Sequence, residues 1–397
     1  MPHRKEWGFS VRVLFTFAGG AGHFIPLLPI ARAMAAAGHE VAFGAQAALL
    51  PTVRRHGFQA HETGGNTFGD EAERQPLRRL DMEREIRAVR DGYAGRIARQ
   101  RALGILALAA GWKPDLLVCD EMDFGSMVAA ERLAVPYATV LVIASGMLAR
   151  RHLLAEPLNA LRAEHGLPTD PDLTMLSRYL VLSPFPPSLR DPHSPLPSTA
   201  LSFHPDRAGE DPPPAWIAEL PDRPSVYVTL GTVFNVESGD LFARLLEGLR
   251  ALPVNVIVTV GPQIDPRELG PQPENVRVER YVSQGALLPH CALVVSHAGS
   301  GTVCGALAHG IPMLLLPMGA DQPFNAQRCE ELGVAGVLDP MDCRPETVRR
   351  EAARLLASSA HRLAAERIKD EIAALPTQET AMALLYRLAE IDRTSRA

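Results

Sequence analysis

Short apolar runs alternate with longer amphipathic ones along most of this chain, and this pattern is the strongest constraint on its fold. In the first half the strand-like runs are residues 11–17, 41–43, 115–119 and 137–142. Almost every position in them is apolar, as in parallel strands that are buried on both faces. Strands that alternate with helices predict an α/β fold with a parallel sheet covered by helices on both sides.

The same alternation resumes in the second half, after an interruption rich in proline. Residues 183–224 hold twelve prolines, a density that excludes a regular helix and predicts an extended linker. Beyond it, further strands are predicted at residues 226–230, 254–260, 276–279, 293–296 and 313–316. Helices are expected from about residue 345 onward, the last over 379–393. The two halves are therefore predicted to be two copies of one architecture.

A length of 397 residues suits two domains of about 150–200 residues each. We predict a first Rossmann-like domain at 1–205, a Pro-rich linker at 206–224, a second such domain at 225–376 and a final helix at 377–397. The arginine-rich helical stretch at 76–110 is longer than a strand–helix unit needs, so we expect it to wall a substrate cleft.

Composition excludes several classes of protein. A net charge of −5 argues against a nucleic-acid surface. The five cysteines lack metal-ligand spacing, so reduced thiols are expected rather than a zinc site or a disulfide framework. Residues 1–10 are polar and lack the apolar core of a signal peptide, and no apolar run approaches the length of a membrane span. A cytoplasmic enzyme is predicted.

One histidine stands where open α/β sheets bind ligands. His23 follows the glycine-rich turn at 19–22, directly after the first strand. A neutral imidazole there can take a proton from a hydroxyl, and the adjacent helix N-terminus is expected to keep its pKa low. Among 13 histidines, position alone favours a polar first-turn residue without a catalytic task.

A carboxylate partner for His23 is expected at the end of the third long strand. Asp120 follows that strand, with Glu121 and Asp123 close behind. An aspartate here can orient an imidazole, but it can equally cap the next helix, because aspartate often begins helices after such turns.

The segment at 294–302 predicts an anion site. An apolar strand runs into His297 and then into a glycine-rich turn that opens a helix, so free backbone amides and a helix dipole face one point. One strand later, Asp321 and Gln322 can reach hydroxyl groups of the same ligand. A phosphate turn followed by such a polar clamp predicts a nucleotide-sugar site.

A dinucleotide site is the alternative interpretation of the turn at 19–22. Its glycine pattern lacks the third glycine, however, and the second strand ends without the acidic residue that binds a ribose. We therefore reject this interpretation.

These motifs resemble the GT-B nucleotide-sugar-dependent glycosyltransferases, in the family that contains plant secondary-metabolite and macrolide or enediyne antibiotic glycosyltransferases. The resemblance covers nearly the whole chain. It implies two Rossmann-like domains that face each other across a cleft, with the C-terminal helix returning to the N-terminal domain. Residues 22–26 match the family's Gly-His-x-x-Pro element, which implies that His23 is the catalytic base and Asp120 its partner.

The resemblance also implies a set of donor-binding residues in the second half. Residues 281–284 replace the frequent Trp-x-Pro-Gln element, so a tyrosine is left to stack on the base. The residues implied to bind the diphosphate, the nucleoside or the sugar are Gly231, Thr232, Tyr281, Val282, Gln284, His297, Gly299, Ser300, Gly301, Thr302, Asp321 and Gln322.

Gly305 is an informative departure from the family pattern. Many UDP-sugar enzymes carry a glutamate here for the ribose hydroxyls, so its loss favours a dTDP-sugar, with UDP-sugar as the alternative. The resemblance implies inverting transfer to a hydroxyl of a hydrophobic natural product. The sequence has no cluster of carboxylates near the phosphate turn, so neither a metal nor another cofactor is expected. The variable segments at 64–110 and 145–180 are expected to hold that acceptor.

Two other functions stay open at this point. One is a sugar-nucleotide epimerase on the same scaffold, and the other is a non-catalytic auxiliary protein that binds a sugar nucleotide. The His23 element and the long helical insertion favour a transferase. The identity of the acceptor, the sugar, the atom glycosylated and the oligomeric state are not predicted.

Overall fold

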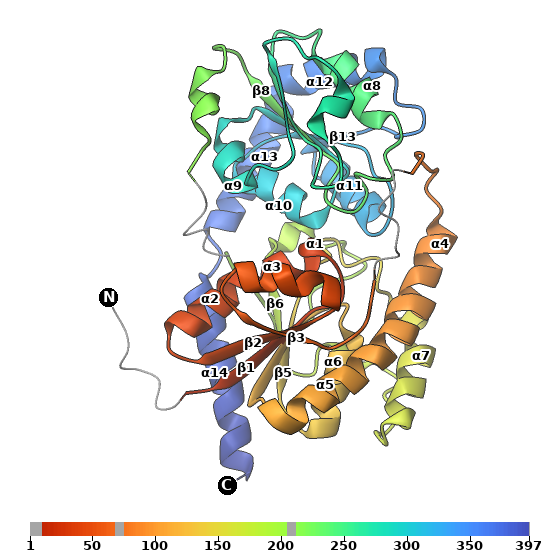
Figure 1. The fold of residues 1–397 in the computed structure, drawn as a ribbon, viewed down its shortest axis with the longest axis vertical. Coiled ribbons are helices and arrows are strands. Elements are labelled where there is room, and N and C mark those ends of the chain that lie inside the picture. Colours follow the sequence, from red (N-terminus) through yellow and green to blue (C-terminus); the bar gives the residue numbers. More distant parts are fainter. Residues whose placement is uncertain (1–9, 68–74, 205–211, 397) are drawn as a thin grey trace.

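Two α/β domains lie one above the other in the computed structural model, which describes residues 10–67, 75–204 and 212–396 (Figure 1). The expectations about residues 1–9 and about the start of the linker at 206–211 lie outside the described residues.

The lower domain is built on a seven-stranded parallel sheet with the order β3-β2-β1-β4-β5-β6-β7. Its central strands β1 and β4 pair directly, and β4 is buried at every position. The wholly apolar runs of the sequence therefore form the middle of the sheet, as parallel strands covered on both faces require. The strands are β1 (Arg12–Thr16), β2 (Glu40–Ala45), β3 (Gln59–Glu62), β4 (Leu116–Asp120), β5 (Tyr137–Val140), β6 (Leu180–Ser183) and β7 (Ala200–Ser202).

The upper domain repeats this plan with a six-stranded sheet, in the order β10-β9-β8-β11-β12-β13. Its strands are β8 (Ser225–Thr229), β9 (Asn255–Thr259), β10 (Val276–Glu279), β11 (Leu293–Ser296), β12 (Met313–Leu315) and β13 (Ala335–Val337). All strand pairs in both sheets are parallel among the residues described. The predicted α/β class with two Rossmann-like domains is confirmed.

Helices cover both sheets. In the lower domain they are α1 (Ala21–Phe24), α2 (Leu28–Ala36), α3 (Leu50–Arg55), α4 (Met82–Arg87), α5 (Ala98–Trp112), α6 (Phe124–Leu133) and α7 (Arg151–Glu164). In the upper domain they are α8 (Leu241–Leu249), α9 (Gln284–Leu287), α10 (Ser300–Ala308), α11 (Gln322–Glu331), α12 (Pro345–Ala357) and α13 (Ser359–Ala373). None of the helices in the described part of the chain combines the length and apolar character needed to span a bilayer.

Four strands were not predicted from the sequence, namely β3, β6, β7 and β13. They are three or four residues long, and β3 and β7 lie at the edges of their sheet, where polar residues are tolerated. The strand β7 falls inside the Pro-rich stretch at 183–224, whose prolines suggested an extended linker. The part of this stretch up to β7 belongs to the lower sheet, because β7 pairs with β6.

The helical stretch predicted at 76–110 begins later than expected. Helix α4 starts at Met82, a ten-residue π-helix spans Ala88–Ile97, and α5 continues to Trp112. Residues 75–81 are extended and cross to the upper domain, where the Gln75 amide donates to the Val236 carbonyl at 2.7 Å.

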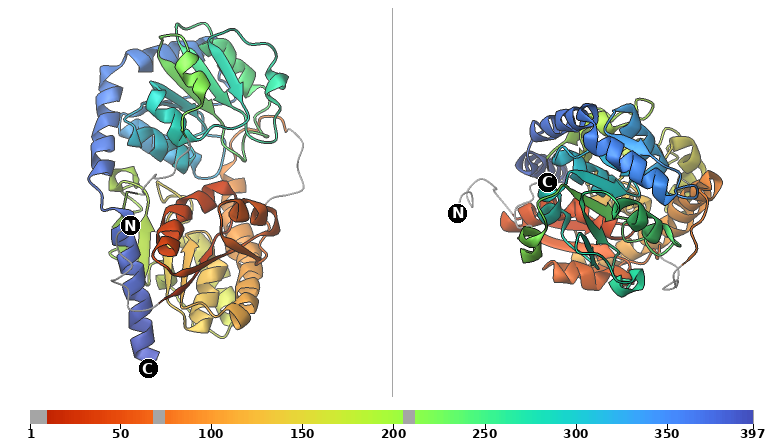
Figure 2. Two further views of the ribbon diagram at one scale, coloured as in Figure 1. Left: turned by 60° about the vertical axis from the view of Figure 1, so that its left-hand side comes forward. Right: turned by 90° about the horizontal axis from the view of Figure 1, so that it is seen from above.

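The last helix, α14 (Gln378–Arg396), returns to the lower domain and lies along α2 (Figures 1 and 2). Its apolar face joins the core of the lower sheet through Ala381, Leu385, Tyr386 and Ala389. The predicted return of the C-terminal helix is confirmed.

Replacing Leu385 with alanine tests how much this return contributes to stability. Leu385 is completely buried, so the substitution should leave a cavity and lower the free energy of unfolding by about 3 kcal/mol. Urea denaturation followed by circular dichroism measures the change. Arg387→Ala on the exposed side of the same helix is the matched control. If Leu385→Ala lowered the free energy of unfolding by less than about 0.5 kcal/mol, the usual scale of a surface substitution, α14 would contribute little.

Candidate active site between the two domains

The carboxyl edges of the two sheets face each other across the domain boundary. Helix α1, which follows β1, lies at the top of the lower domain, and α10 and α11 lie along the underside of the upper one (Figure 1). Direct contacts join the two edges, such as the Ala144 amide, which donates to the Ser300 hydroxyl at 2.9 Å. Residues predicted from both halves of the chain therefore share one region.

His23 and Asp120 form a pair at the edge of the lower sheet. The His23 Nδ1 atom lies 3.3 Å from Asp120 Oδ2. Asp120 is completely buried and also accepts the amides of Ala18, at 2.7 Å, and Met122, at 2.6 Å. These amides hold the carboxylate in place, and the carboxylate in turn orients the imidazole.

Gly19 makes room for the imidazole. Its φ is +155°, and a Cβ atom there would lie 2.2 Å from His23 Cδ2. The glycine at position 19 is thus explained by the close approach of the His23 ring to the backbone.

The expected low pKa of His23 is wrong. Burial does lower the pKa of His23, but the charge and hydrogen bonding of Asp120, together with Asp321 and Glu121, outweigh burial and raise it above 6.5. The flanking helix α1 is only four residues long, so its dipole is a weak influence beside a buried carboxylate.

The two other carboxylates near Asp120 have separate tasks. Asp123 begins helix α6, where it accepts the Ser126 amide, and forms a buried bidentate ion pair with Arg101. Glu121 accepts the amides of Val142 and Ile143. Of the three candidates that the sequence left open, Asp120 is the one that faces His23.

Tyr93 is a site residue that the sequence analysis missed. It lies in the π-helix, and its ring is nearly parallel to that of His23, with centroids 6.2 Å apart. Burial, with the charges of Asp120, Asp321 and Glu85, raises the pKa of the phenol, which therefore stays protonated near neutral pH. A lone tyrosine between Gly92 and Gly95 in a charged helix was the available signal.

The start of α10 presents its amides where the sequence placed the diphosphate. Gly299 is the N-cap of this helix, and no described residue accepts from the first-turn amides of Ser300, Gly301 and Thr302. Helix N-termini with free amides favour anions. The Ser300 hydroxyl is differently engaged, because it donates to Asp321 Oδ2 at 2.7 Å.

His297 is neutral and tightly enclosed. Burial lowers its pKa to about 4 despite a hydrogen bond with the Thr229 backbone. A Cβ atom on Gly231 (φ +77°) or on Gly299 would lie 2.6 Å from His297 Nε2. The imidazole is thus a neutral group between two glycines, available to a phosphate as a hydrogen-bond partner and not as a fixed positive charge.

The residues predicted for the nucleoside and phosphate differ in exposure. Tyr281 is 73% exposed, as a platform for a base would be, while the Val282 side chain is buried in the upper core. Gln284 donates to the Thr302 hydroxyl at 3.1 Å, and Thr232 is exposed on the turn after β8. Val282 can therefore reach a donor only through its backbone.

The two residues of the predicted sugar clamp, Asp321 and Gln322, have different hydrogen-bond partners. Asp321 is oriented by the Ser300 hydroxyl and by Asn325 Nδ2, both at 2.7 Å from Oδ2. Burial raises the pKa of Asp321, while these hydrogen bonds oppose the shift. Gln322 instead accepts the amides of Met318 and Gly319 through Oε1, so its carbonyl braces the turn. Asn325, one turn further along α11, is a second site residue that the sequence analysis missed.

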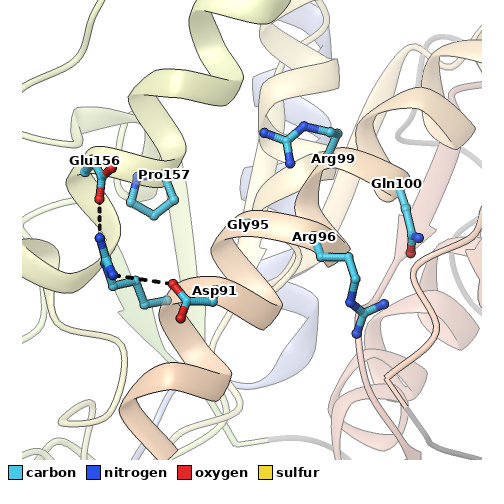
Figure 3. Close-up of a pocket in the computed structure, with 8 residues that line it drawn as sticks. Asp91, Gly95, Arg96, Arg99, Gln100, Glu156 and Pro157 are labelled. Carbon is cyan, nitrogen blue, oxygen red and sulfur yellow. Dashed lines mark hydrogen bonds and ion pairs between the residues drawn. The ribbon is translucent and has the colours of Figure 1, made fainter.

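A cavity of about 450 Å³ opens elsewhere, between the π-helix, α5 and α7 (Figure 3). Its charges are largely paired within the protein, since Arg90 contacts Asp91 and Glu156, and Arg99 binds Glu164 outside the lining. None of the predicted catalytic or donor residues lines it. This cavity is therefore separate from the candidate active site.

Known proteins resemble this chain over nearly its full length. Residues 243–387 match the family model described as Erythromycin biosynthesis protein CIII-like, C-terminal domain. The chain is 30% identical to the Aclacinomycin-T 2-deoxy-L-fucose transferase of Streptomyces galilaeus (97% of this chain, 98% of the relative). It is also 30% identical to the 4'-demethylrebeccamycin synthase of Lentzea aerocolonigenes (92% and 96%).

A solved structure supports the same relationship. The crystal structure of the glycosyltransferase VinC in complex with DTDP superposes with a TM-score of 0.76 at 27% identity, and covers 96% of this chain and 99% of VinC. The fold, the domain arrangement and the sequence similarity therefore point to the same group of proteins.

Proposed function

Since this chain belongs to the GT-B family of macrolide and anthracycline antibiotic glycosyltransferases, we propose that it transfers the sugar of a dTDP-sugar, with inversion, to a hydroxyl of a hydrophobic natural product. The observation that carries the proposal is the joint placement of two groups. The pair of partly exposed His23 and buried Asp120 in the lower domain lies within electrostatic range of Asp321 of the upper domain. The residue proposed as the base and the residue proposed to bind the sugar thus come from separate domains and act on each other through their charges.

The proposed reaction is a single displacement. His23 Nε2 takes the proton of the acceptor hydroxyl, whose oxygen attacks the anomeric carbon while the bond from that carbon to the diphosphate oxygen breaks. Asp120 stabilises the imidazolium that forms. The first-turn amides of α10 and the neutral His297 ring then bind the negative charge that develops on the leaving diphosphate, a type of electrostatic stabilisation with large effects on rate. No metal is required in this proposal.

The preference for dTDP rests on Gly305 and its surroundings. Gly305 is buried, and a Cβ atom there would lie 3.1 Å from Leu288 Cδ1 and 3.4 Å from Gln284 Oε1. A side chain at this position would therefore be in tight contact with Leu288, and glycine supplies no carboxylate for a ribose. A complex of the relative VinC with DTDP supports the same nucleotide.

Named relatives favour transfer over the two alternatives. The relatives above are a 2-deoxy-L-fucose transferase and a synthase, and the structural neighbour is a glycosyltransferase. An epimerase would also have no use for a base at His23 aimed at a separate acceptor, and an auxiliary protein would need neither His23 nor Asp120.

The proposal is tested with dTDP and UDP binding by calorimetry, followed by turnover on a polyphenol, macrolide and anthracycline acceptor panel with dTDP- and UDP-sugars. We expect dTDP to bind more tightly than UDP, and product with an inverted anomeric centre to form from a dTDP-sugar. EDTA should leave the rate unchanged. Turnover with UDP-glucose and with no dTDP-sugar would overturn the nucleotide assignment. A loss of rate in EDTA that magnesium restores would overturn the metal-free mechanism.

A further inference from the structure

A short loop of the lower domain reaches into the sugar clamp of the upper domain. We call residues 142–145, which follow β5, the docking loop. Its four backbone amides divide into two pairs. The amides of Val142 and Ile143 point back to Glu121 Oε1 of their own domain. Those of Ala144 and Ser145 cross to the other domain.

The crossing amides bind the two side chains that orient Asp321. Ala144 donates to Ser300 Oγ at 2.9 Å, and Ser145 donates to Asn325 Oδ1 at 3.2 Å. A serine hydroxyl that accepts from an amide has its single proton free for another partner, and here that partner is Asp321. An asparagine whose oxygen accepts from an amide must present its NH₂ group on the other side. That group donates to Asp321 Oδ2 at 2.7 Å.

Asp321 is consequently held by one of its two oxygens. Oδ2 accepts from both Ser300 and Asn325, and no other described residue donates a side-chain or amide hydrogen to Oδ1. This leaves Oδ1 for a sugar hydroxyl, and the charge of the Asp321 carboxylate also acts on His23 and Tyr93.

The docking loop is held from behind as well. Arg190 donates to the Ile143 carbonyl at 3.1 Å, and the Asp191 amide donates to the Ser145 carbonyl at 3.1 Å. With Glu121 on two amides and these donors on two carbonyls, the amides of Ala144 and Ser145 are the ones that bind the upper domain.

We propose that the docking loop completes the donor-sugar site: Glu121 holds the loop, and its amides of Ala144 and Ser145 fix Ser300 and Asn325 so that Asp321 presents one oxygen to the sugar. Glu121 and Asn325 are positioning residues in this scheme. The docking-loop proposal extends the proposed function and rests on it. Sugar recognition then depends on the contact between the two domains, whereas the nucleotide binds to the upper domain alone.

The test separates nucleotide binding from sugar recognition. Glu121→Leu removes the carboxylate that holds the docking loop. Glu121 lies in the lower domain, which contains none of the predicted donor-binding residues. Asn325→Leu removes the link between Ser145 and Asp321 at similar volume. Both variants should raise the KM for the productive dTDP-sugar by about 5- to 100-fold, a usual range for coupling between sites. The Kd for dTDP, measured by calorimetry, should stay at the wild-type value.

Conservative and surface variants complete the test. Glu121→Gln keeps an oxygen that accepts both amides, so its KM for the dTDP-sugar should stay near the wild-type value. Burial raises the pKa of Glu121 to about 7, consistent with a role that needs the oxygen atom more than the charge. Glu164→Gln, which alters an exposed ion pair with Arg99, is the surface control.

Each outcome has one meaning. If wild type neither binds dTDP nor transfers a sugar, the proposed function fails. If wild type transfers while both leucine variants keep the wild-type KM for the donor, the docking-loop proposal is overturned. Equal loss of dTDP and dTDP-sugar binding would also overturn it, because that pattern indicates general damage to the fold.

Discussion

His23→Ala should lower kcat by about 10²–10⁴-fold, the contribution expected of a positioned general base. The acceptor hydroxyl would then have to lose its proton to water while it attacks the sugar. The affinity for dTDP should not change, because the predicted nucleotide and phosphate ligands all lie in the upper domain. Single-turnover transfer with saturating donor measures the chemical step, and calorimetry measures the affinity.

His193→Ala is the matched control for this experiment. His193 also pairs with an aspartate, Asp191, at 2.9 Å, but its side chain is 87% exposed. The control should therefore keep wild-type activity. A His23→Ala variant with more than a tenth of the wild-type kcat would show that another group takes the proton, since even the low end of the range is about 100-fold.

Asp120→Asn should also cost about 10²–10⁴-fold in kcat, because the imidazolium would lose its counter-charge and the imidazole its fixed tautomer. Its second signature is a shift in pH dependence. Wild-type kcat/KM should rise with pH as His23 loses its proton, through a pKa above 6.5. Without the Asp120 charge, burial dominates and lowers that pKa, so the acidic limb of the profile should move to lower pH.

Asp115→Asn is the control for the charge change. Asp115 precedes β4 at the opposite edge of the sheet, where it accepts the Arg12 amide at 2.8 Å. It should leave the pH profile unchanged. Thermal unfolding of both variants checks the fold, since Asp120 accepts two backbone amides. An acidic limb at the same pH in Asp120→Asn and wild type would mean that His23 is not the titrating group.

The elements that the sequence predicted well are those whose signal is local and strong. The strands β10 and β11 match the predicted ranges at both ends, because β11 is a mostly apolar run and β10 alternates valine with charged residues. The strands that were missed, such as β7 and β13, are three residues long and owe their conformation to neighbouring strands. Their own residues carry too little periodicity to be recognised.

In the candidate site, the sequence alone determined which residues stand at the carboxyl edges of the strands. His23, Asp120 and Ser300 each follow a strand in a strand–turn–helix unit, and this placement is encoded within about ten neighbouring residues. The parallel α/β class and the likeness to a family follow from the same local patterns. The tertiary structure decided which of these residues meet.

Three contacts of the candidate site could be identified only from the tertiary structure. Asp120 rather than Asp123 faces His23, since Asp123 is bound by Arg101. Gln322 turns to its own loop, while Asn325 joins Ser300 on Asp321. The docking loop reaches Ser300 across 156 positions of sequence. Side-chain orientation and contacts between domains depend on how segments that are distant in sequence pack against one another. A local sequence pattern does not contain this information, so these contacts became known only from the folded structure.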